Sequence, residues 1–187
     1  MWAGVDVGGR RKGFHLALVD GEGLHAGPEH VRRVEEAVLW LRWRSPQLVA
    51  VDSPRFPAPE GSLSRPEERE LARAVCGIRY TPEYAALLES RRYYQWILNG
   101  FDLYSALEEA GLDAIECYPT ASFTRWAGPR GSRPRTDWSR RALRRAGLAG
   151  LPPRLNQDER DAIGAALTAR CYDLDLAESF GEIVVPL

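Results

Sequence analysis

Apolar residues in the first quarter of the chain follow two different patterns. Residues 2–7 are an apolar run that a single acid, Asp6, interrupts, and residues 13–19 form a second run of the same kind. Such runs predict strands, and the two together predict a hairpin, with a short third strand near 24–26. Between residues 31 and 43 the apolar positions instead recur every three to four residues, which predicts a helix. The expected order is therefore strand, strand, strand, helix.

The rest of the chain continues to alternate between strands and helices. Residues 48–51 are all apolar and run directly into Asp52, as expected of a buried strand that ends on a charged residue. The proline-rich segment 53–65 predicts a long loop. The later elements that the pattern predicts are helices at 66–75, 83–98 and 101–110, a short strand at 114–118, a helix that begins near Asp137 and ends at Gly147, a helix at 157–173 and a short apolar segment at 183–185.

Length and composition limit what these elements can build. With 187 residues, of which 44% are hydrophobic, the chain fits one compact domain with insertions better than two independent domains. The net charge of -1 excludes a protein that coats nucleic acid or an anionic membrane with its whole surface. No stretch approaches the roughly 20 apolar residues of a membrane span, and the first residues do not resemble a secretory signal. We therefore expect a cytoplasmic protein without a membrane partner.

The cysteines and histidines limit the chemistry further. The three cysteines are far apart and form no C-x-x-C motif, so we expect them to be buried free thiols. The three histidines form neither an H-x-x-H nor an H-E-x-x-H motif, which argues against a metal centre built from histidine. Catalytic chemistry must then depend mostly on carboxylates.

Acidic residues in three of the expected strands require an explanation. Asp6 interrupts the first strand, Asp52 ends the strand at 48–51, and Glu116 lies within the strand at 114–118. An acid in an apolar strand is costly unless a cation or hydrogen bonds compensate its charge. One acid at a strand end can simply cap the following turn, but three together favour a shared site. Because strand ends in open α/β folds meet at one edge, we expect Asp6 and Asp52 to converge there.

The last expected helix adds two acids. Asp158 and Asp161 are three residues apart and share a face, which continues as a stripe of alanines suited to close packing on a sheet. Acids in a first helical turn also complement the helix dipole, and this alone could account for Asp158. Asp161 lies further into the helix and on the alanine stripe. Oxygen ligands without histidine or cysteine suit Mg²⁺ or Mn²⁺, and two such ions about 4 Å apart can clamp the oxygens of a phosphodiester.

These motifs resemble those of a known superfamily. The segment Gly-Val-Asp-Val-Gly at 4–8 before a hairpin, Asp52 after the fourth strand, and Asp-x-x-Asp at 158–161 resemble the ribonuclease-H-like superfamily, which includes bacterial Holliday-junction resolvases. More closely, the blocks Val-Asp-Ser-Pro, Arg-Tyr-Thr-Pro, Glu-Cys-Tyr-Pro and Asp-Glu-Arg-Asp-Ala, in this order, resemble the domain-of-unknown-function 429 family, described as predicted ribonuclease-H-like nucleases. The resemblance covers most of the chain.

The resemblance implies both a fold and a site. The fold is one α/β ribonuclease-H-like domain over 1–187, with a mixed five-stranded sheet in the order 3-2-1-4-5, flanking helices, and insertions at about 53–112 and 119–150. The site holds Mg²⁺ or Mn²⁺. The resemblance implies four catalytic residues. Asp6, Asp52 and Asp161 match the superfamily's acids on the first strand, the fourth strand and the final helix, and Glu116 matches an acid of the narrower family. The implied metal ligands are these four together with Asp158.

A basic segment precedes the last helix. Residues 125–154 hold nine arginines against one acid, Asp137, which gives a local charge of +8. Arginines interleaved with aromatic residues suit phosphates and unpaired bases, whereas a basic face that is only solvated is the alternative. The residues expected to contact DNA or RNA are four arginines on one side of the helix and two nearby tryptophans: Arg140, Arg141, Arg144, Arg145, Trp126 and Trp138.

Three functions are compatible with these features. The first is metal-dependent hydrolysis of nucleic-acid phosphodiesters. The acidic residues would attract the metal ions, and the neighbouring basic segment would attract the phosphates of the substrate. The second is a catalytically silent nucleic-acid-binding module with the same fold. The third is a nucleotide-binding phosphotransferase of the actin and sugar-kinase type, whose first hairpin also reads Gly-x-Asp-x-Gly, although such proteins pair two of these domains. Metal binding separates the first function from the second, and nucleotide affinity identifies the third.

Overall fold

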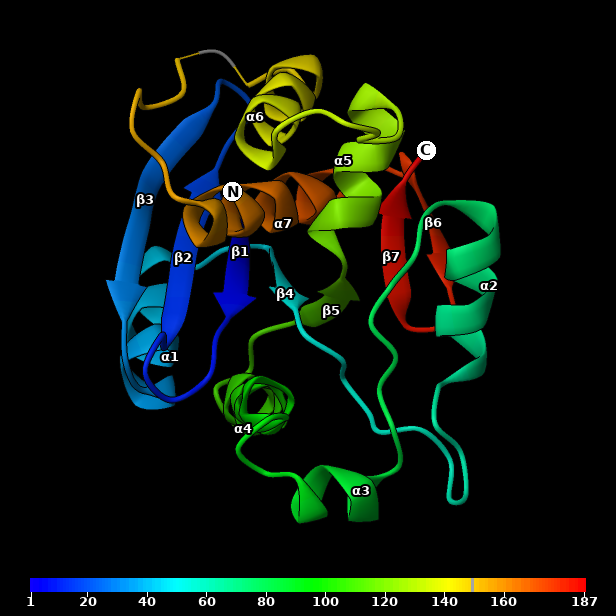
Figure 1. Cartoon of the computed structure of the whole chain (residues 1–187). Coiled ribbons are helices and arrows are strands. Elements are labelled where there is room, and N and C mark those ends of the chain that lie inside the picture. The colour runs from blue at the N-terminus through cyan, green and yellow to red at the C-terminus, as the bar shows by residue number, and fades with distance from the viewer. Residues whose placement is uncertain (149) are drawn as a thin grey trace.

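The computed structural model describes residues 1–148 and 150–187, which form one mixed sheet with helices on both faces (Figure 1). The strands are β1 (Trp2–Val7), β2 (Phe14–Val19), β3 (Leu24–Val31), β4 (Leu48–Asp52), β5 (Ala114–Cys117), β6 (Ala177–Phe180) and β7 (Ile183–Pro186). Their order in the sheet is β3-β2-β1-β4-β5-β7-β6. The strand β1 is antiparallel to β2 and parallel to β4, and β5 and β7 continue the parallel part.

The helices of the described residues are α1 (Val34–Arg44), α2 (Pro66–Ala74), α3 (Tyr84–Glu89), α4 (Gln95–Glu109), α5 (Pro119–Ala127), α6 (Arg135–Arg145) and α7 (Gln157–Asp173). Helices α1 and α4 cover one face of the sheet, and α5, α6 and α7 cover the other (Figure 1). In these parts of the chain, no helix has both the length and the apolar character needed to cross a membrane. The expected insertion at 119–150 includes residue 149, which lies outside the described residues.

The ribonuclease-H-like fold and the expected order of its first five strands are confirmed, and two further strands extend the sheet beyond β5. β7 contains the apolar segment expected at 183–185, and β6 pairs with it in an antiparallel hairpin. The sequence of β6 is Ala-Glu-Ser-Phe, which contains no apolar run. This strand is defined by its pairing with β7, so the hydrophobic pattern did not reveal it.

Some expected helix boundaries are wrong. The strand β3 continues to Val31, so α1 begins at Val34 and not at residue 31. Helix α4 runs unbroken from 95 to 109, whereas the pattern predicted a break between 98 and 101. Gly100 lies inside α4, where a Cβ atom would come 1.9 Å from Ser53 Oγ. The glycine allows the helix to pack closely on the segment after β4 and does not end the helix.

Helix α5 is absent from the sequence-based prediction, which ended the strand at 114–118 and expected the next helix only near Asp137. Pro119 occupies the first turn of α5, where a missing N–H costs nothing because it has no partner inside the helix. The carbonyl of Tyr118 accepts hydrogen bonds from the backbone N–H groups of Ala121 and Ser122, which starts the helix. The proline therefore begins a helix immediately after β5.

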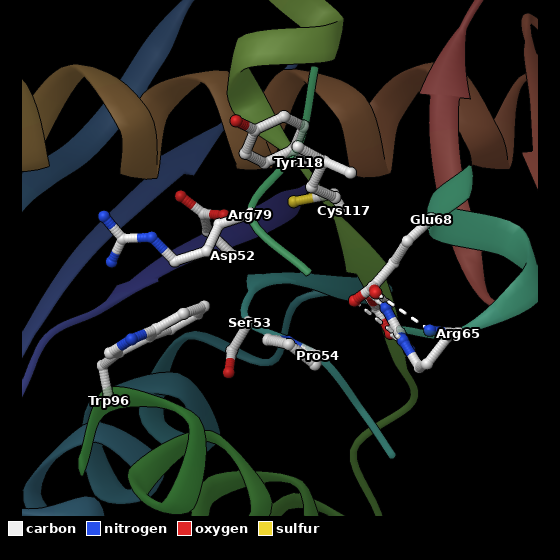
Figure 2. Close-up of a pocket in the computed structure, with 11 residues that line it drawn as sticks. Asp52, Ser53, Pro54, Arg65, Glu68, Arg79, Trp96, Cys117 and Tyr118 are labelled. Carbon is white, nitrogen blue, oxygen red and sulfur yellow. Dashed lines mark hydrogen bonds and ion pairs between the residues drawn. The ribbon is translucent and has the colours of Figure 1, made fainter. Parts of the chain in front are cut away.

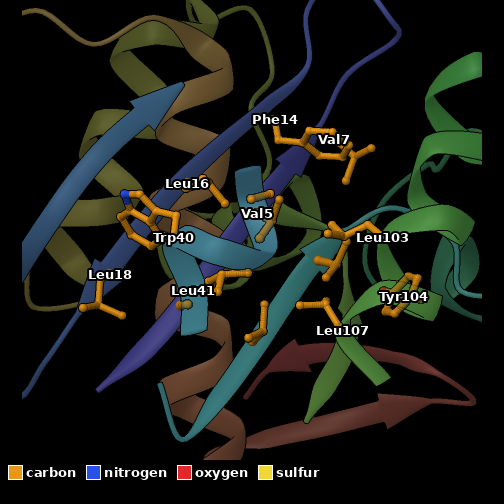
Figure 3. Close-up of a cluster of buried hydrophobic side chains, with 14 residues drawn as sticks. Val5, Val7, Phe14, Leu16, Leu18, Trp40, Leu41, Leu103, Tyr104 and Leu107 are labelled. Atoms are coloured by element: carbon orange, nitrogen blue, oxygen red, sulfur yellow. The ribbon is translucent and has the colours of Figure 1, made fainter. Parts of the chain in front are cut away.

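The alternation of side chains along the strands divides the core into two halves. Figure 3 shows the half under α1 and α4, where Val5 and Leu16 from the sheet pack with Leu41 and Leu103 from the helices. The side chains of β1 and β2 that point to the other face of the sheet pack against α7, whose alanine stripe is buried as expected. Because Asp6 follows Val5, its side chain is on the α7 face.

The close approach of α7 to β1 depends on one glycine. A Cβ atom on Gly4 would lie 2.1 Å from the carbonyl oxygen of Ala162 and 2.2 Å from the backbone nitrogen of Ala166. No other residue leaves enough space there, since real Cβ contacts are longer than 3.0 Å. The backbone of α7 therefore lies directly on β1, two residues before Asp6.

Candidate metal centre

Three of the expected acids come together at the carboxyl edge of the central strands. Asp6 is the penultimate residue of β1 and Asp52 is the last residue of β4; the two strands are parallel neighbours, and the two residues are paired in register. Asp161 reaches them from the second turn of α7. One carboxylate oxygen from each residue lies within 4.8 Å of the oxygens from the other two. This geometry agrees with the convergence that the sequence pattern predicted.

The start of α7 is fixed by a capping box, which sets the position of Asp161. The Asn156 side chain accepts a hydrogen bond from the Glu159 N–H, and the Glu159 carboxylate accepts one from the Asn156 N–H. Asp161 then accepts hydrogen bonds from Gln157 Nε2 at 2.7 Å and from an Arg135 guanidinium nitrogen at 3.1 Å. The Asp161 side chain is 6% exposed, so it is held in place and largely shielded from water.

Asp158 lies at the edge of the same site and is partly exposed. Its two carboxylate oxygens accept hydrogen bonds from Lys12 Nζ at 2.8 and 3.1 Å. Asp158 also forms a second group with Asp6 and His15, in which the ligand atoms again lie within 4.8 Å of one another. Asp6 thus belongs to both groups and is the central carboxylate of the site.

Glu116 was expected to be a catalytic residue and metal ligand, but the structure does not bring it into either group. In the sheet it is paired with Val51, so the alternation of side chains places it on the face opposite to Asp52. There its carboxylate accepts hydrogen bonds from the Arg65 guanidinium and from the Arg55 N–H. Arg65 is 2% exposed and also binds the fully buried Glu68. Glu116 therefore belongs to a buried ion-pair network that joins β5 to the start of α2.

The three clustered acids disfavour one another's charges. The pKa of Asp161 is raised to about 7, mainly by burial; Arg135 opposes this increase and the Asp6 charge adds to it. Burial also raises the pKa of Asp52 well above its ordinary value, with further increases from Asp6 and Asp161. The pKa of Asp6 is raised by burial, an effect that the neighbouring His15 partly offsets. The carboxylates lack enough positive charge among the described residues to remain ionised together at low cost.

The donor set fits a divalent cation. The cluster of Asp6, Asp52 and Asp161 offers three carboxylates at one point, and among the described residues Arg135 is the only arginine or lysine that forms an ion pair with one of them. Hard oxygen ligands in this number, with room for water, suit Mg²⁺ or Mn²⁺. A bound divalent cation would remove the repulsion that raises the three pKa values.

The tryptophans of the basic segment do not lie at the acids. Trp138 is 2% exposed, and its Nε1 donates a hydrogen bond to the Gly128 carbonyl, so it cannot stack on a base as expected. It packs edge to face against Phe123 in the core beneath α6. Trp126 lines a surface pocket with Arg145 and Arg170, near the end of α7. Nine residues of helix separate Arg170 from Asp161, which corresponds to about 14 Å.

The arginines of α6 differ in their surroundings. Arg141, Arg144 and Arg145 are exposed, whereas Arg140 is half-buried and donates hydrogen bonds to the carbonyls of Pro152 and Pro153. The arginine of this segment that reaches the acids is Arg135, at the start of α6. The sequence pattern missed its role because it is one of nine arginines in the segment.

Two other residues at the site were also missed, although the hairpin could have revealed one of them. His15 is directly opposite Asp6 in the β1–β2 pair, on the same face. Pairing the two expected strands in this register would have found it. Lys12, the only lysine of the chain, lies in the turn between the two strands, where no periodic pattern predicts the direction of a side chain.

A pocket opens beside Asp52, between the ends of β4 and β5 and the helical segment 66–98. Figure 2 shows Trp96, Arg79 and Tyr118 around Asp52, with the bonded pair of Arg65 and Glu68 on the other side. Arg79 is exposed and Trp96 is partly buried. The segment 66–98 therefore brings a cationic and an aromatic side chain next to Asp52.

The strand order, the first hairpin and the acids of β1, β4 and α7 define the ribonuclease-H-like class of α/β proteins. Within this class, the chain belongs to the DUF429 family, whose model, described as a protein of unknown function, matches residues 4–182. No curated protein matches the sequence.

Solved structures of RuvC from Thermus thermophilus share the fold. One RuvC structure is 20% identical with a TM-score of 0.50, and the match covers 99% of this chain and 98% of that chain. A second RuvC structure, in complex with a Holliday junction substrate, is 17% identical with a TM-score of 0.52, over 92% of this chain and 94% of that chain. Identities this low support a common fold.

Proposed function

We propose that the protein is a divalent-metal-dependent nuclease that hydrolyses phosphodiester bonds of nucleic acid. The observation that carries the proposal is the convergence of Asp6, Asp52 and Asp161, whose ligand atoms lie within 4.8 Å of one another at the edge of a ribonuclease-H-like sheet. In this arrangement Asp6, Asp52 and Asp161 hold Mg²⁺ or Mn²⁺. When bound, the metal polarises the scissile phosphate and makes a water molecule a better nucleophile.

The residues around the cluster have distinct tasks in this proposal. Asp6 and Asp52 are fixed by the sheet, and Asp161 is aligned by Gln157 and Arg135. Arg135 is 45% exposed at its side chain, so its guanidinium can also contact a phosphate oxygen next to the scissile bond. Glu116 lies outside the chemistry and stabilises the segment that forms the neighbouring pocket.

The substrate class follows from the charges around the site. Arg135 and Arg79 flank the acids, and Arg141, Arg144 and Arg145 continue the positive surface along α6. The RuvC protein of the same fold, in its complex with a Holliday junction, binds branched DNA, which makes junctions a substrate to test first. Trp96 and Tyr118 offer faces on which an unpaired base can stack. We therefore propose single-stranded or branched nucleic acid as the preferred substrate.

The two alternative functions make different predictions. A catalytically silent module would bind nucleic acid without any change when an acid is replaced. A phosphotransferase of the actin and sugar-kinase type would bind a nucleotide with its phosphates at the first hairpin. The raised pKa of Asp161 and the clustered acids favour metal-dependent chemistry, because a protein without it has no use for such costly charges.

The proposal is tested by incubating the protein with labelled Holliday junctions, single strands, duplexes and RNA, each in Mg²⁺, Mn²⁺ or EDTA. We expect cleavage of at least one substrate in Mg²⁺ or Mn²⁺, none in EDTA, and a loss of at least about 100-fold for Asp6→Asn and Asp161→Asn. Glu22→Gln, a change at an exposed turn, is the matched control and should cleave as the parent does. Cleavage that survives both aspartate substitutions would refute the assignment.

A further inference from the structure

Helix α1 carries an apolar surface that faces solvent in the described part of the chain. Trp40 and Leu41 are buried in the core. Leu39, however, is 65% exposed and Trp43 is 87% exposed. These two residues lie four positions apart and therefore share one side of the helix. A helix that is apolar on several sides is normally buried, and tryptophan is a highly buried residue on average, so this side of α1 is suited to a partner.

Two apolar grooves flank Leu39 on this surface, and Leu39 lines both of them. The first groove lies between α1 and β3, and its lining includes Val31 and Trp43. The second groove lies between α1 and α4, where the small side chains of Ala106 and Ala110 leave space. A ridge between two grooves is a shape against which a second helix can pack.

The two ends of the surface carry opposite charges. Glu35 is exposed in the first turn of α1, and Arg42 is exposed in its last turn. Neither residue forms an ion pair with another described residue. They lie seven residues apart, or about 10 Å along the helix, which is too far for them to pair with each other. Both charges are therefore available to a partner.

We infer that this surface binds a second copy of the chain, with the two α1 helices packed antiparallel about a twofold axis. The midpoint between Glu35 and Arg42 lies next to Leu39, so a rotation of 180° about that point brings each Glu35 opposite the Arg42 of the other copy. The same rotation brings the two Leu39 side chains together and places each Trp43 in the other copy's groove beside Val31. Such self-complementarity is what an isologous interface requires.

Other properties of the surface favour a protein partner over nucleic acid. The groove between α1 and α4 is lined by Glu35 and Glu109, which would repel phosphates. A central tryptophan with charged residues around it is instead typical of the contacts that dominate protein interfaces. Helix α1 covers the face of the sheet opposite to α7, so the inference does not depend on the proposed nuclease activity.

Sedimentation velocity of the full-length protein over a range of concentrations tests the inference. We expect an equilibrium between monomer and dimer. Trp43→Ser should weaken it at least about 100-fold, because a central aromatic contact is worth about tenfold or more and each dimer loses two of them. Leu63→Ser is the matched control, since Leu63 is 80% exposed in the loop between β4 and α2. Both variants change exposed side chains, so their circular dichroism should match that of the parent.

Charge reversal tests the antiparallel pairing independently of Trp43. Glu35→Arg and Arg42→Glu should each weaken self-association about tenfold or more, because each dimer then holds two contacts between like charges. Mixed with each other, the two variants should form a heterodimer of nearly parental affinity, since every contact then joins opposite charges. The chain that carries both changes should associate with itself again for the same reason.

Three results would overturn the inference. A chain that stays monomeric at its highest soluble concentration has no interface between copies on α1. A dimer whose affinity is the same in Trp43→Ser, Leu63→Ser and the charge variants associates through another surface. If both charge variants dissociate but their mixture does not associate, the helices are not paired as inferred.

Discussion

The sheet face on which an acidic residue lies determines whether it joins the metal cluster. Asp52 ends β4 and Glu116 lies near the end of β5, yet the first points toward α7 and the second away from it. The difference is set by the register between β4 and β5, which pairs Val51 with Glu116. A shift of β5 by one residue relative to β4 would move the Glu116 side chain to the face on which Asp52 lies.

The separate roles of the two acids can be measured. Glu116→Gln should lower the free energy of unfolding by about 3 kcal/mol, because Arg65 loses a charged partner in a buried site. It should leave Mn²⁺ affinity almost unchanged in the folded protein. Asp52→Asn should leave stability at neutral pH unchanged or raised, and weaken Mn²⁺ binding at least about tenfold. Urea unfolding and calorimetric titration measure both quantities, and equal losses of affinity would contradict the assignment.

The raised pKa of Asp161 predicts how stability depends on pH without metal. Since the folded-state pKa, about 7, lies above the ordinary value of 3.8, folded protein binds this proton more tightly than unfolded protein does. Stability from this group is therefore present at about pH 4 and lost as the pH rises to about 7. Asp161→Asn does not titrate, so its stability relative to the parent in EDTA should increase over that interval by on the order of 2 to 4 kcal/mol.

The measurement is thermal unfolding in EDTA between pH 4 and 8, repeated with Mn²⁺ at pH 7.5. Mn²⁺ should stabilise the parent more than Asp161→Asn, because the metal binds the ionised carboxylates. A stability difference between the two proteins that stays constant across this pH range would contradict the raised pKa.

At the scale of elements, the centre depends on how closely α7 lies against β1. Gly4 allows this approach, and Gly164 on the opposite side of α7 similarly accommodates Phe123 of α5. The helix thereby lies between β1 and α5 with little freedom to move. The separation of Asp161 from Asp6 is therefore set by backbone contacts.

Gly4→Ala tests this dependence. The new methyl group would meet the Ala162 carbonyl, so α7 must move outward and Asp161 must move away from Asp6. We expect a loss of about 2 to 4 kcal/mol in unfolding free energy and at least about tenfold weaker Mn²⁺ binding in the folded fraction. Gly21→Ala is the matched control, since a Cβ there meets nothing within 4 Å. Unchanged metal affinity in Gly4→Ala would show that the helix position does not determine the site.

The sequence predicted those elements in which apolar residues recur at regular spacing. The first hairpin, β4 and α7 are examples, and with them came Asp6, Asp52 and Asp161. It did not predict β6, which has no apolar run, or the effect of Gly100, which reflects contact with the distant Ser53. Glu116 shows the same limit, because the face on which it lies depends on the register between β4 and β5, which a single sequence does not specify.

At the scale of the whole molecule, positive charge extends beyond the site along α6. Its exposed arginines, Arg141, Arg144 and Arg145, lie toward the end of the helix that is farther from Asp161. Such residues can contact phosphates remote from the scissile bond, which increases affinity and does not affect the chemistry. They would contact nucleic acid of any sequence, because phosphate contacts carry no sequence information directly.

The triple change of these three arginines to alanine should weaken binding of all tested oligonucleotides alike. Counterion release predicts that the slope of log K against log salt becomes less steep by up to about three. Arg32, Arg42 and Arg73, exposed arginines elsewhere on the molecule, changed together to alanine provide the control. Fluorescence anisotropy at several salt concentrations measures the slopes, and identical slopes for the two triple variants would show that α6 does not bind nucleic acid.

The central claim is that Asp6, Asp52 and Asp161 bind a divalent metal together, and a crystal soaked in Mn²⁺ tests it most directly. The account predicts an anomalous difference peak at roughly 2.0 to 2.3 Å from one oxygen of each of the three carboxylates. The peak should be absent from crystals of Asp6→Asn soaked in the same way. No peak between the three carboxylates at saturating Mn²⁺, or carboxylates that point away from one another, would contradict the account.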